Sequence, residues 1–147
     1  MRNIAVVDSG PLIALFDRDD FFHQAVVGFL AGRPGLHLLT TWAVLNETCA
    51  LLNSRVDKQA ELDFLAWVES AGLAVAAQDA ASLPRIRALI EKYHDLPFDF
   101  ADASVAVLAA ESGVAQVLTL DRDFDIYRDA SGRRLRNLLA PTLSRSR

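Results

Sequence analysis

Four acidic residues of this sequence, Asp8, Glu47, Asp102 and Asp121, could together perform metal chemistry. Asp8 ends the apolar run of residues 4–7, and Asp121 directly follows the largely apolar run of residues 116–120. A charge at the end of a buried strand needs a partner, because an isolated carboxylate is costly to bury. Mg²⁺ and Mn²⁺ are hard cations that take carboxylate oxygens together with waters and phosphate oxygens. Three or four converging carboxylates are what metal-dependent cleavage of a phosphodiester needs.

Asp8 and Glu47 each have an alternative role. Asp8 could cap the helix that follows it. Glu47 falls on the same predicted helical stripe as Ala43, Ala50 and Leu51, so it should face the core or a pocket. A carboxylate in that position either binds a metal or forms a buried ion pair, and we favour the metal.

Asp99 and Asp102 stand three residues apart at the start of another predicted helix and therefore share one face. Both could serve the helix itself, since Asp99 suits the N-cap and Asp102 complements the helix dipole from the first turn. The structural and chemical roles are compatible. We predict Asp102 as a metal ligand and Asp99 as a cap or an outer-shell contributor.

The alternating acids Asp121, Asp123 and Asp125 resemble the start of a calcium loop of the EF-hand kind. Such a loop needs a glycine at its sixth position and a glutamate at its twelfth, where this chain has Ile126 and Gly132. An EF-hand is therefore excluded. Asp121 is the predicted site member, and Asp123 and Asp125 are predicted to be solvated turn residues.

Other common chemistries find little support. The three histidines, His23, His37 and His94, have no metal-ligand spacing, and Cys49 is the lone thiol, which argues against zinc. The chain has no glycine-rich phosphate loop and no nucleophile elbow. A phosphatase of the haloacid dehalogenase type would need an aspartate at position 10, where this chain has Gly10.

The elements that must position the four acids follow from hydrophobic periodicity. We expect strands over residues 4–7, 36–40, 73–76, 116–120 and 135–139, and helices over about 12–16, 22–31, 42–54, 58–71, 79–93 and 100–112. Strands separated by helices pair in parallel through right-handed crossovers. The expected fold is an α/β three-layer sandwich with a central parallel sheet of four to five strands flanked by helices. Ligands of such sheets collect at the carboxyl ends of the strands, where Asp8 and Asp121 both stand.

Length and composition predict one domain over residues 1–140, with residues 141–147 as a flexible tail, because 147 residues that are 52% apolar can build a single core. The net charge of −4 argues against nucleic-acid binding by charge alone. Seven of the 15 basic residues nevertheless follow position 121, so a basic edge could lie beside a cation pocket; the alternative is a solvated surface with a frayed tail. No apolar stretch reaches the roughly 18 residues that span a bilayer, and no leader opens the sequence, which favours a cytoplasmic protein.

Three segments in their order, VVDSGPLIALFDRDD, TTWAVLNETCALL and LPFDFADASVAVLAAESGVAQVLTLDRDF, resemble the PIN-domain family, in particular the VapC-type toxins of type II toxin–antitoxin pairs. The resemblance runs from about Ile4 to Leu139. It implies a metal-dependent ribonuclease in which Asp8, Glu47, Asp102 and Asp121 bind the metal, and it implies that Ser9 and Thr119 orient the site. The first motif departs from the commoner pattern by having Gly10 where asparagine is frequent.

The expected function is therefore hydrolysis of RNA phosphodiesters by one or two Mg²⁺ ions, with Mn²⁺ as a substitute, in the toxin of a toxin–antitoxin system. The resemblance also implies a cognate antitoxin protein and a homodimer as partners, with no membrane. Two alternatives stay open from the sequence. One is a non-catalytic module whose acidic edge binds a basic partner, and the other is a PIN nuclease of RNA processing without a toxin role.

Overall fold

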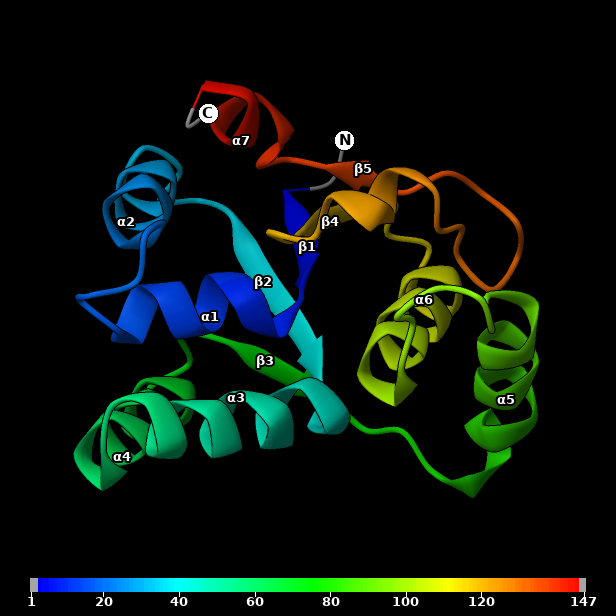
Figure 1. The fold of residues 1–147 in the computed structure, drawn as a ribbon, viewed down its shortest axis with the longest axis horizontal. Coiled ribbons are helices and arrows are strands. Elements are labelled where there is room, and N and C mark those ends of the chain that lie inside the picture. The colour runs from blue at the N-terminus through cyan, green and yellow to red at the C-terminus, as the bar shows by residue number, and fades with distance from the viewer. Residues whose placement is uncertain (1–2, 146–147) are drawn as a thin grey trace.

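The computed structural model of this chain describes residues 3–145, which build a five-stranded sheet with helices on both sides (Figure 1). The strands are β1 (Ile4–Val7), β2 (His37–Thr41), β3 (Ala74–Ala76), β4 (Gln116–Leu118) and β5 (Arg136–Asn137). They lie in the order β3-β2-β1-β4-β5, and every neighbouring pair is parallel. The predicted parallel α/β sandwich is confirmed.

The helices divide between the two faces of the sheet. Their bounds are α1 (Ser9–Phe16), α2 (His23–Ala31), α3 (Trp42–Arg55), α4 (Lys58–Glu69), α5 (Leu83–Lys92), α6 (Phe100–Ser112) and α7 (Ala140–Arg145), with short 3₁₀ turns η1 (Ala80–Ser82) and η2 (Arg122–Asp125). In Figure 1, α1 to α4 lie to the left of the sheet and α5 and α6 to its right. No helix within residues 3–145 has both the length and the apolar character that crossing a membrane requires.

The core forms around β1 and α6. Residues 5–7 of β1 are completely or almost completely buried, as expected for a central parallel strand that is covered on both faces. Every residue of α6 from Ala101 to Ala109 is buried as well, so this helix is enclosed all round. Both elements carry an acid of interest at the end that reaches the carboxyl edge of the sheet.

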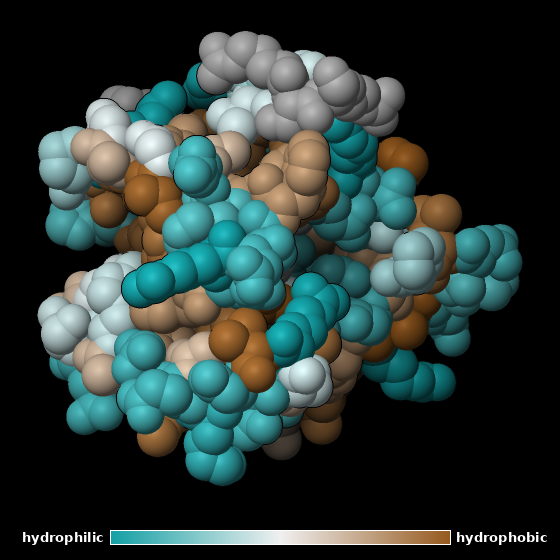
Figure 2. Space-filling model, turned by 60° about the vertical axis from the view of Figure 1, so that its left-hand side comes forward, coloured by the Kyte–Doolittle hydropathy of each residue, from teal (hydrophilic) through white to brown (hydrophobic). Residues whose placement is uncertain are grey.

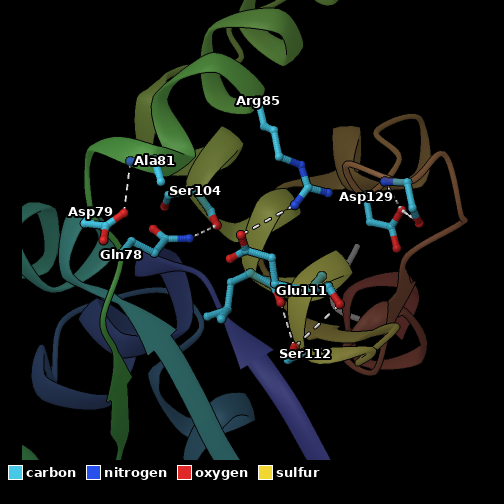
Figure 3. Close-up of polar contacts among 11 residues, drawn as sticks. Gln78, Asp79, Ala81, Arg85, Ser104, Glu111, Ser112 and Asp129 are labelled. Atoms are coloured by element: carbon cyan, nitrogen blue, oxygen red, sulfur yellow. Dashed lines mark hydrogen bonds and ion pairs between the residues drawn. The ribbon is translucent and has the colours of Figure 1, made fainter.

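Helix α5 is fastened to α6 by polar contacts that Figure 3 shows. The Arg85 guanidinium lies 3.4 Å from the Glu111 carboxylate in an ion pair between the two helices. Below it, the Gln78 amide donates to the carbonyl oxygen of Ser104 in α6 (3.1 Å). These contacts fix the segment that connects β3 to α6 against the helix that carries Asp102.

Two helix boundaries differ from the sequence prediction for identifiable reasons. The helix predicted over residues 79–93 is split into η1 and α5, with Pro84 in the first turn of α5, where proline is favoured. Helix α1 begins at Ser9 instead of Leu12, since Pro11 is tolerated in a first turn. Strand β5 is shorter than predicted and covers residues 136–137 alone.

The predicted flexible tail over residues 141–147 is a helix for most of its length. Residues 140–145 form α7, and Leu143 within it is buried. The Arg122 guanidinium donates to the Leu143 carbonyl oxygen (2.9 Å) and so ties α7 to η2. A helix of this length with one buried leucine is too short to show a hydrophobic periodicity in the sequence. Residues 146–147 of the predicted tail lie outside the described residues.

Figure 2 brings the side of the molecule with α2 and α4 forward. Apolar residues appear there as separate patches among hydrophilic side chains, without a single continuous apolar surface on the visible face. This mixture is ordinary for the outside of a folded domain, much of whose accessible surface is apolar.

Candidate active site

Asp8 is a buried acid at the carboxyl end of β1 and also the N-cap of α1, so the capping role considered for it is formed, while its role as a metal ligand stays a prediction. Its side chain is 7% exposed. The Ser9 backbone N–H donates to Asp8 Oδ1 (2.8 Å), and the Thr119 hydroxyl donates to Oδ2 (3.0 Å). The carboxylate is thereby held at the edge of the sheet in one orientation.

Glu47 lies on α3 at the margin of the core stripe and is half-buried. Its Oε1 accepts a hydrogen bond of 2.5 Å from the Ser9 hydroxyl, which links α3 to the start of α1. The buried stripe itself consists of Val44, Leu45, Thr48, Cys49 and Leu52. Of the stripe predicted through Ala43, Ala50 and Leu51, Ala43 and Leu51 are partly buried against the core, whereas Ala50 is exposed, so the prediction was wrong for Ala50. None of the ion pairs between described residues includes Glu47, so the buried ion pair weighed as its alternative is not formed.

Asp99 and Asp102 form a reciprocal capping box at the start of α6. The Asp99 N–H donates to Asp102 Oδ2, and the Asp102 N–H donates to Asp99 Oδ1, both at 3.0 Å. The predicted cap at Asp99 is confirmed. Asp102 is nevertheless buried, and it projects from the first turn of the helix that runs along the sheet.

Asp121 follows β4 and begins η2, where its Oδ1 accepts the Asp123 N–H (2.9 Å). The Asp121 N–H donates to the Thr119 hydroxyl oxygen (3.0 Å). Because the same hydroxyl donates to Asp8, Thr119 joins the two acids through a single oxygen. Of the two acids predicted to be solvated turn residues, Asp125 is exposed and Asp123 is half-buried.

Asn137 is a supporting residue that sequence analysis missed. Its Oδ1 accepts the Thr119 N–H (3.3 Å), and its Nδ2 donates to the Thr119 carbonyl (3.1 Å), so it clamps the backbone of the residue that holds Asp8. The signal lies in the pairing of β5 with β4, which places Asn137 opposite Val117. A single sequence does not reveal that register.

Thr41 and Ser104 are a second supporting pair that sequence analysis missed. Thr41 caps α3 by accepting the Val44 N–H (3.1 Å), and its hydroxyl lies 2.8 Å from that of Ser104 in α6. This buried contact joins the helices that carry Glu47 and Asp102. The signal for Thr41 was present, because threonine directly before a helical pattern is a usual N-cap.

The four carboxylates of Asp8, Glu47, Asp102 and Asp121, here termed the acidic rim, act on one another electrostatically. Burial, followed by the charges of Glu47 and Asp121, raises the pKa of Asp8 to about 6. Burial also raises the pKa of Asp102 to about 8, with contributions from the charges of Asp8 and Asp99. Asp8 therefore interacts with each of the other three members.

Burial and the charges of Asp123 and Asp99 also raise the pKa of Asp121. No basic side chain offsets this negative charge by an ion pair within residues 3–145. The ion pairs found there are Arg85–Glu111, His94–Asp95 and Arg133–Asp129. Neighbouring carboxylates that raise one another's pKa repel one another when ionised, and a bound cation would offset this repulsion.

The donor set of the acidic rim fits a hard divalent cation by its chemistry. All four groups offer carboxylate oxygens, and each oxygen that already accepts a hydrogen bond has a further lone pair. In their present orientations, no three His, Cys, Asp or Glu side chains among the described residues are arranged to hold a metal ion. The carboxylates accept hydrogen bonds from neighbouring N–H and O–H groups.

The fold and the rim define an α/β domain with converging acids at the carboxyl edge of a parallel sheet. Residues 5–130 match the family model described as PIN domain, and the chain belongs to this family of ribonucleases. No curated protein matches the chain.

Two solved structures share the fold. One is VapC20 of Mycobacterium tuberculosis, described as a toxin that cleaves the sarcin-ricin loop; its TM-score is 0.76 at 24% identity, over 84% of this chain and 93% of that one. The other is PAE2754 from Pyrobaculum aerophilum, with a TM-score of 0.59 at 21% identity, over 98% of this chain and 96% of that one. At these identities the likeness concerns the fold.

The raised pKa values of Asp8 (about 6) and Asp102 (about 8) predict how stability depends on pH. Both groups bind a proton more readily in the folded protein than in the unfolded chain. Their contribution is therefore full below the ordinary carboxyl pKa of 3.8 and is lost as the pH rises through the folded values. Without divalent metal, the free energy of unfolding should fall from about pH 4 to about pH 9, by about 3 kcal/mol for Asp8 alone.

Urea denaturation in EDTA at a series of pH values measures this effect. Asp102→Asn removes one titrating group and should flatten the curve, whereas Asp95→Asn, at a highly exposed site, should leave it unchanged. A wild-type stability that rises with pH across this range would contradict the electrostatic description of the rim.

Proposed function

We propose that this protein is a divalent-metal-dependent endoribonuclease that hydrolyses RNA phosphodiesters, with Mg²⁺ as cofactor and Mn²⁺ as a substitute. The observation that carries the proposal is the convergence of the acidic rim at one edge of the sheet, where neighbouring negative charges raise the pKa values of its buried members. Membership of the PIN-domain family supports it.

In this proposal the acidic rim holds the cation and other residues position its carboxylates. A Mg²⁺ ion held by these carboxylates would supply Lewis-acid chemistry, polarising the phosphate and lowering the pKa of a water nucleophile. Ser9 orients both Asp8, through its N–H, and Glu47, through its hydroxyl. Thr119 holds Asp8 from the opposite side, and Asp99 fixes the turn that carries Asp102. Because the pKa of Asp102 is raised to about 8, a cation bound there would compete with a proton for this carboxylate.

Cleavage of single-stranded RNA by the purified protein should require added Mg²⁺ or Mn²⁺. Asp8→Asn and Asp102→Asn each remove a charge at nearly constant shape, so each should reduce the cleavage rate by at least about 100-fold with little loss of fold. Glu47→Gln should act in the same direction. Asp95→Asn is the matched control, because that carboxylate is exposed and its one ion pair is with the adjacent His94. A gel assay with circular dichroism of each variant measures both properties.

Two outcomes would contradict this proposal. Full activity of both aspartate variants would remove the acidic rim from the chemistry. Absence of cleavage under all metal conditions, together with tight binding of a basic partner, would instead favour the non-catalytic acidic module.

We further propose that the nuclease is the toxin of a toxin–antitoxin pair. The shared fold with VapC20, a toxin that cleaves the sarcin-ricin loop, supports this role. The cognate antitoxin would insert an arginine or lysine into the acidic rim, because a guanidinium can pair with the carboxylates that repel one another. A hollow of about 340 Å³ beside the rim has room for such a side chain and is lined by Ala43, Asn46, Glu47, Asp99, Phe100 and Ala101. The antitoxin helix would cover apolar surface near α1 and α3.

Expression in the host without its antitoxin should therefore arrest growth. Asp8→Asn, or co-expression of wild type with its cognate antitoxin, should relieve the arrest, and colony counts after induction measure the effect. Harmless wild-type protein at high expression would refute the toxin role and favour a PIN nuclease of RNA processing, while the ribonuclease proposal would stand on its own assay.

We propose a homodimer that forms through the face of α5. Two adjoining grooves of about 690 and 510 Å³ share Leu83, Ile86 and Phe100, and Trp42, Leu83 and Phe100 are about half-exposed there. Arg87 and Glu91 line the same face one helical turn apart. A twofold axis would place Arg87 of one copy near Glu91 of the other, so the face is complementary to itself in charge as well as apolar.

Analytical ultracentrifugation at micromolar concentration should show the dimer. Leu83→Glu would bury a charge in the interface and should weaken the dimer at least about tenfold. Leu62→Glu is the control, since Leu62 has similar exposure but lies on α4. A strict monomer, or equal weakening by both variants, would exclude this face.

A further inference from the structure

Tyr127 is a fully buried residue that packs against Phe98 and Phe124, and the proposed mechanism does not use it. Its side chain is 1% exposed, and its ring packs against three aromatic rings. The ring centroids lie 4.6 Å from Phe98, 5.1 Å from Phe124 and 5.2 Å from Tyr93. These contacts hold the ring in one place and would be made equally well by a phenylalanine.

The Tyr127 hydroxyl is distinguished by its lack of a partner. It is buried and has no hydrogen bond to any described residue. The neighbouring Tyr93 hydroxyl, in contrast, accepts the backbone N–H of Arg128 (3.0 Å). A buried polar group without a partner destabilises a folded protein, so such a hydroxyl calls for an explanation.

The Tyr127 ring packs beside two acidic segments of the chain. Phe98 immediately precedes Asp99, and Phe124 immediately follows Asp123, so Tyr127 lies between the two segments that border the rim. The Tyr127 N–H also donates to the Asp123 carbonyl (3.0 Å), which fixes the residue to η2.

The hydroxyl in this position is a donor. Burial, and then the charges of Asp121, Asp123, Asp102 and Asp99, raise the pKa of Tyr127 far above its ordinary value. The phenol therefore keeps its proton, and carboxylates are the acceptors within electrostatic reach. Asp121, the strongest of these charges, directs one oxygen at the Asp123 N–H (2.9 Å) in the metal-free structure.

We propose, on the basis of the proposed metal-dependent function, that Tyr127 is a positioning residue whose hydroxyl donates a hydrogen bond to Asp121 when that carboxylate turns to hold the cation. The hydroxyl then gains in the metal-bound state the partner that it lacks in the metal-free one. Hydrogen bonds of this kind to a metal-binding carboxylate typically change metal affinity by about 10- to 100-fold.

The test measures metal affinity and metal-free stability together in Tyr127→Phe. Isothermal titration with Mn²⁺ should show affinity reduced by about 10-fold or more. The Tm in EDTA should be at least as high as that of wild type, because an unpartnered buried hydroxyl has been removed. Tyr93→Phe is the matched control from the same aromatic cluster. It leaves the Arg128 N–H without its acceptor, so it should lower the Tm and leave Mn²⁺ affinity unchanged.

The Tm and the Mn²⁺ affinity of Tyr127→Phe together distinguish a positioning role from a purely structural one. A lowered Tm for Tyr127→Phe, whatever its affinity, would show that the hydroxyl stabilises the metal-free fold and would overturn the proposal. Unchanged Mn²⁺ affinity in Tyr127→Phe would overturn it as well, while the metal site itself would stand. Failure of wild type to bind Mn²⁺ would overturn both this proposal and the proposed function.

Discussion

The buried charge of Asp8 is the constraint around which the carboxyl edge of the sheet is arranged. The carboxylate at the end of the central strand is only 7% exposed, and it has no basic partner among the ion pairs of the described residues. The chain supports it with dipoles instead, using the Ser9 N–H and the Thr119 hydroxyl. Dipoles orient the carboxylate without neutralising it, so the negative charge stays available to a cation.

The surrounding framework extends the same principle. Thr40 donates to the Val7 carbonyl (2.7 Å), Thr41 contacts Ser104, and Asn137 clamps Thr119, all through uncharged groups. Each contact joins two elements that end near the acidic rim. A framework of neutral hydrogen bonds holds like charges close together while competing little with a metal for their oxygens, since lysine and arginine are absent from it.

The sequence predicted best the elements that are fully buried and the helix caps that depend on neighbouring residues. The apolar run of residues 4–7 predicted β1 to the residue, because a strand covered on both faces has no polar positions. Asp99 was predicted as a cap from local chemistry alone, and the capping box bears this out. Such features depend on neighbours within a few positions, so one sequence is enough.

Features that depend on distant partners were harder to predict. The stripe of α3 was partly misplaced because alanine and leucine occur on both sides of Glu47, and contacts with α4, α1 and α6 decide which side faces inward. The clamp by Asn137 and the role of Tyr127 arise from the packing of segments against the rim. The four acids themselves were picked out by strand ends and helix faces, but their mutual orientation required the fold.

The bond between Thr119 and Asp8 spans 111 residues of sequence and has a consequence for biosynthesis. β1 leaves the ribosome well before β4, which lies beside it in the sheet. A nascent chain that has exposed α1, α3 and α6 still lacks Thr119 and Asp121, so Asp8 is not yet fixed. Long-range strand pairing of this kind also forms slowly. The acidic rim is thus completed only after every residue from β1 to Asp121 has been synthesised.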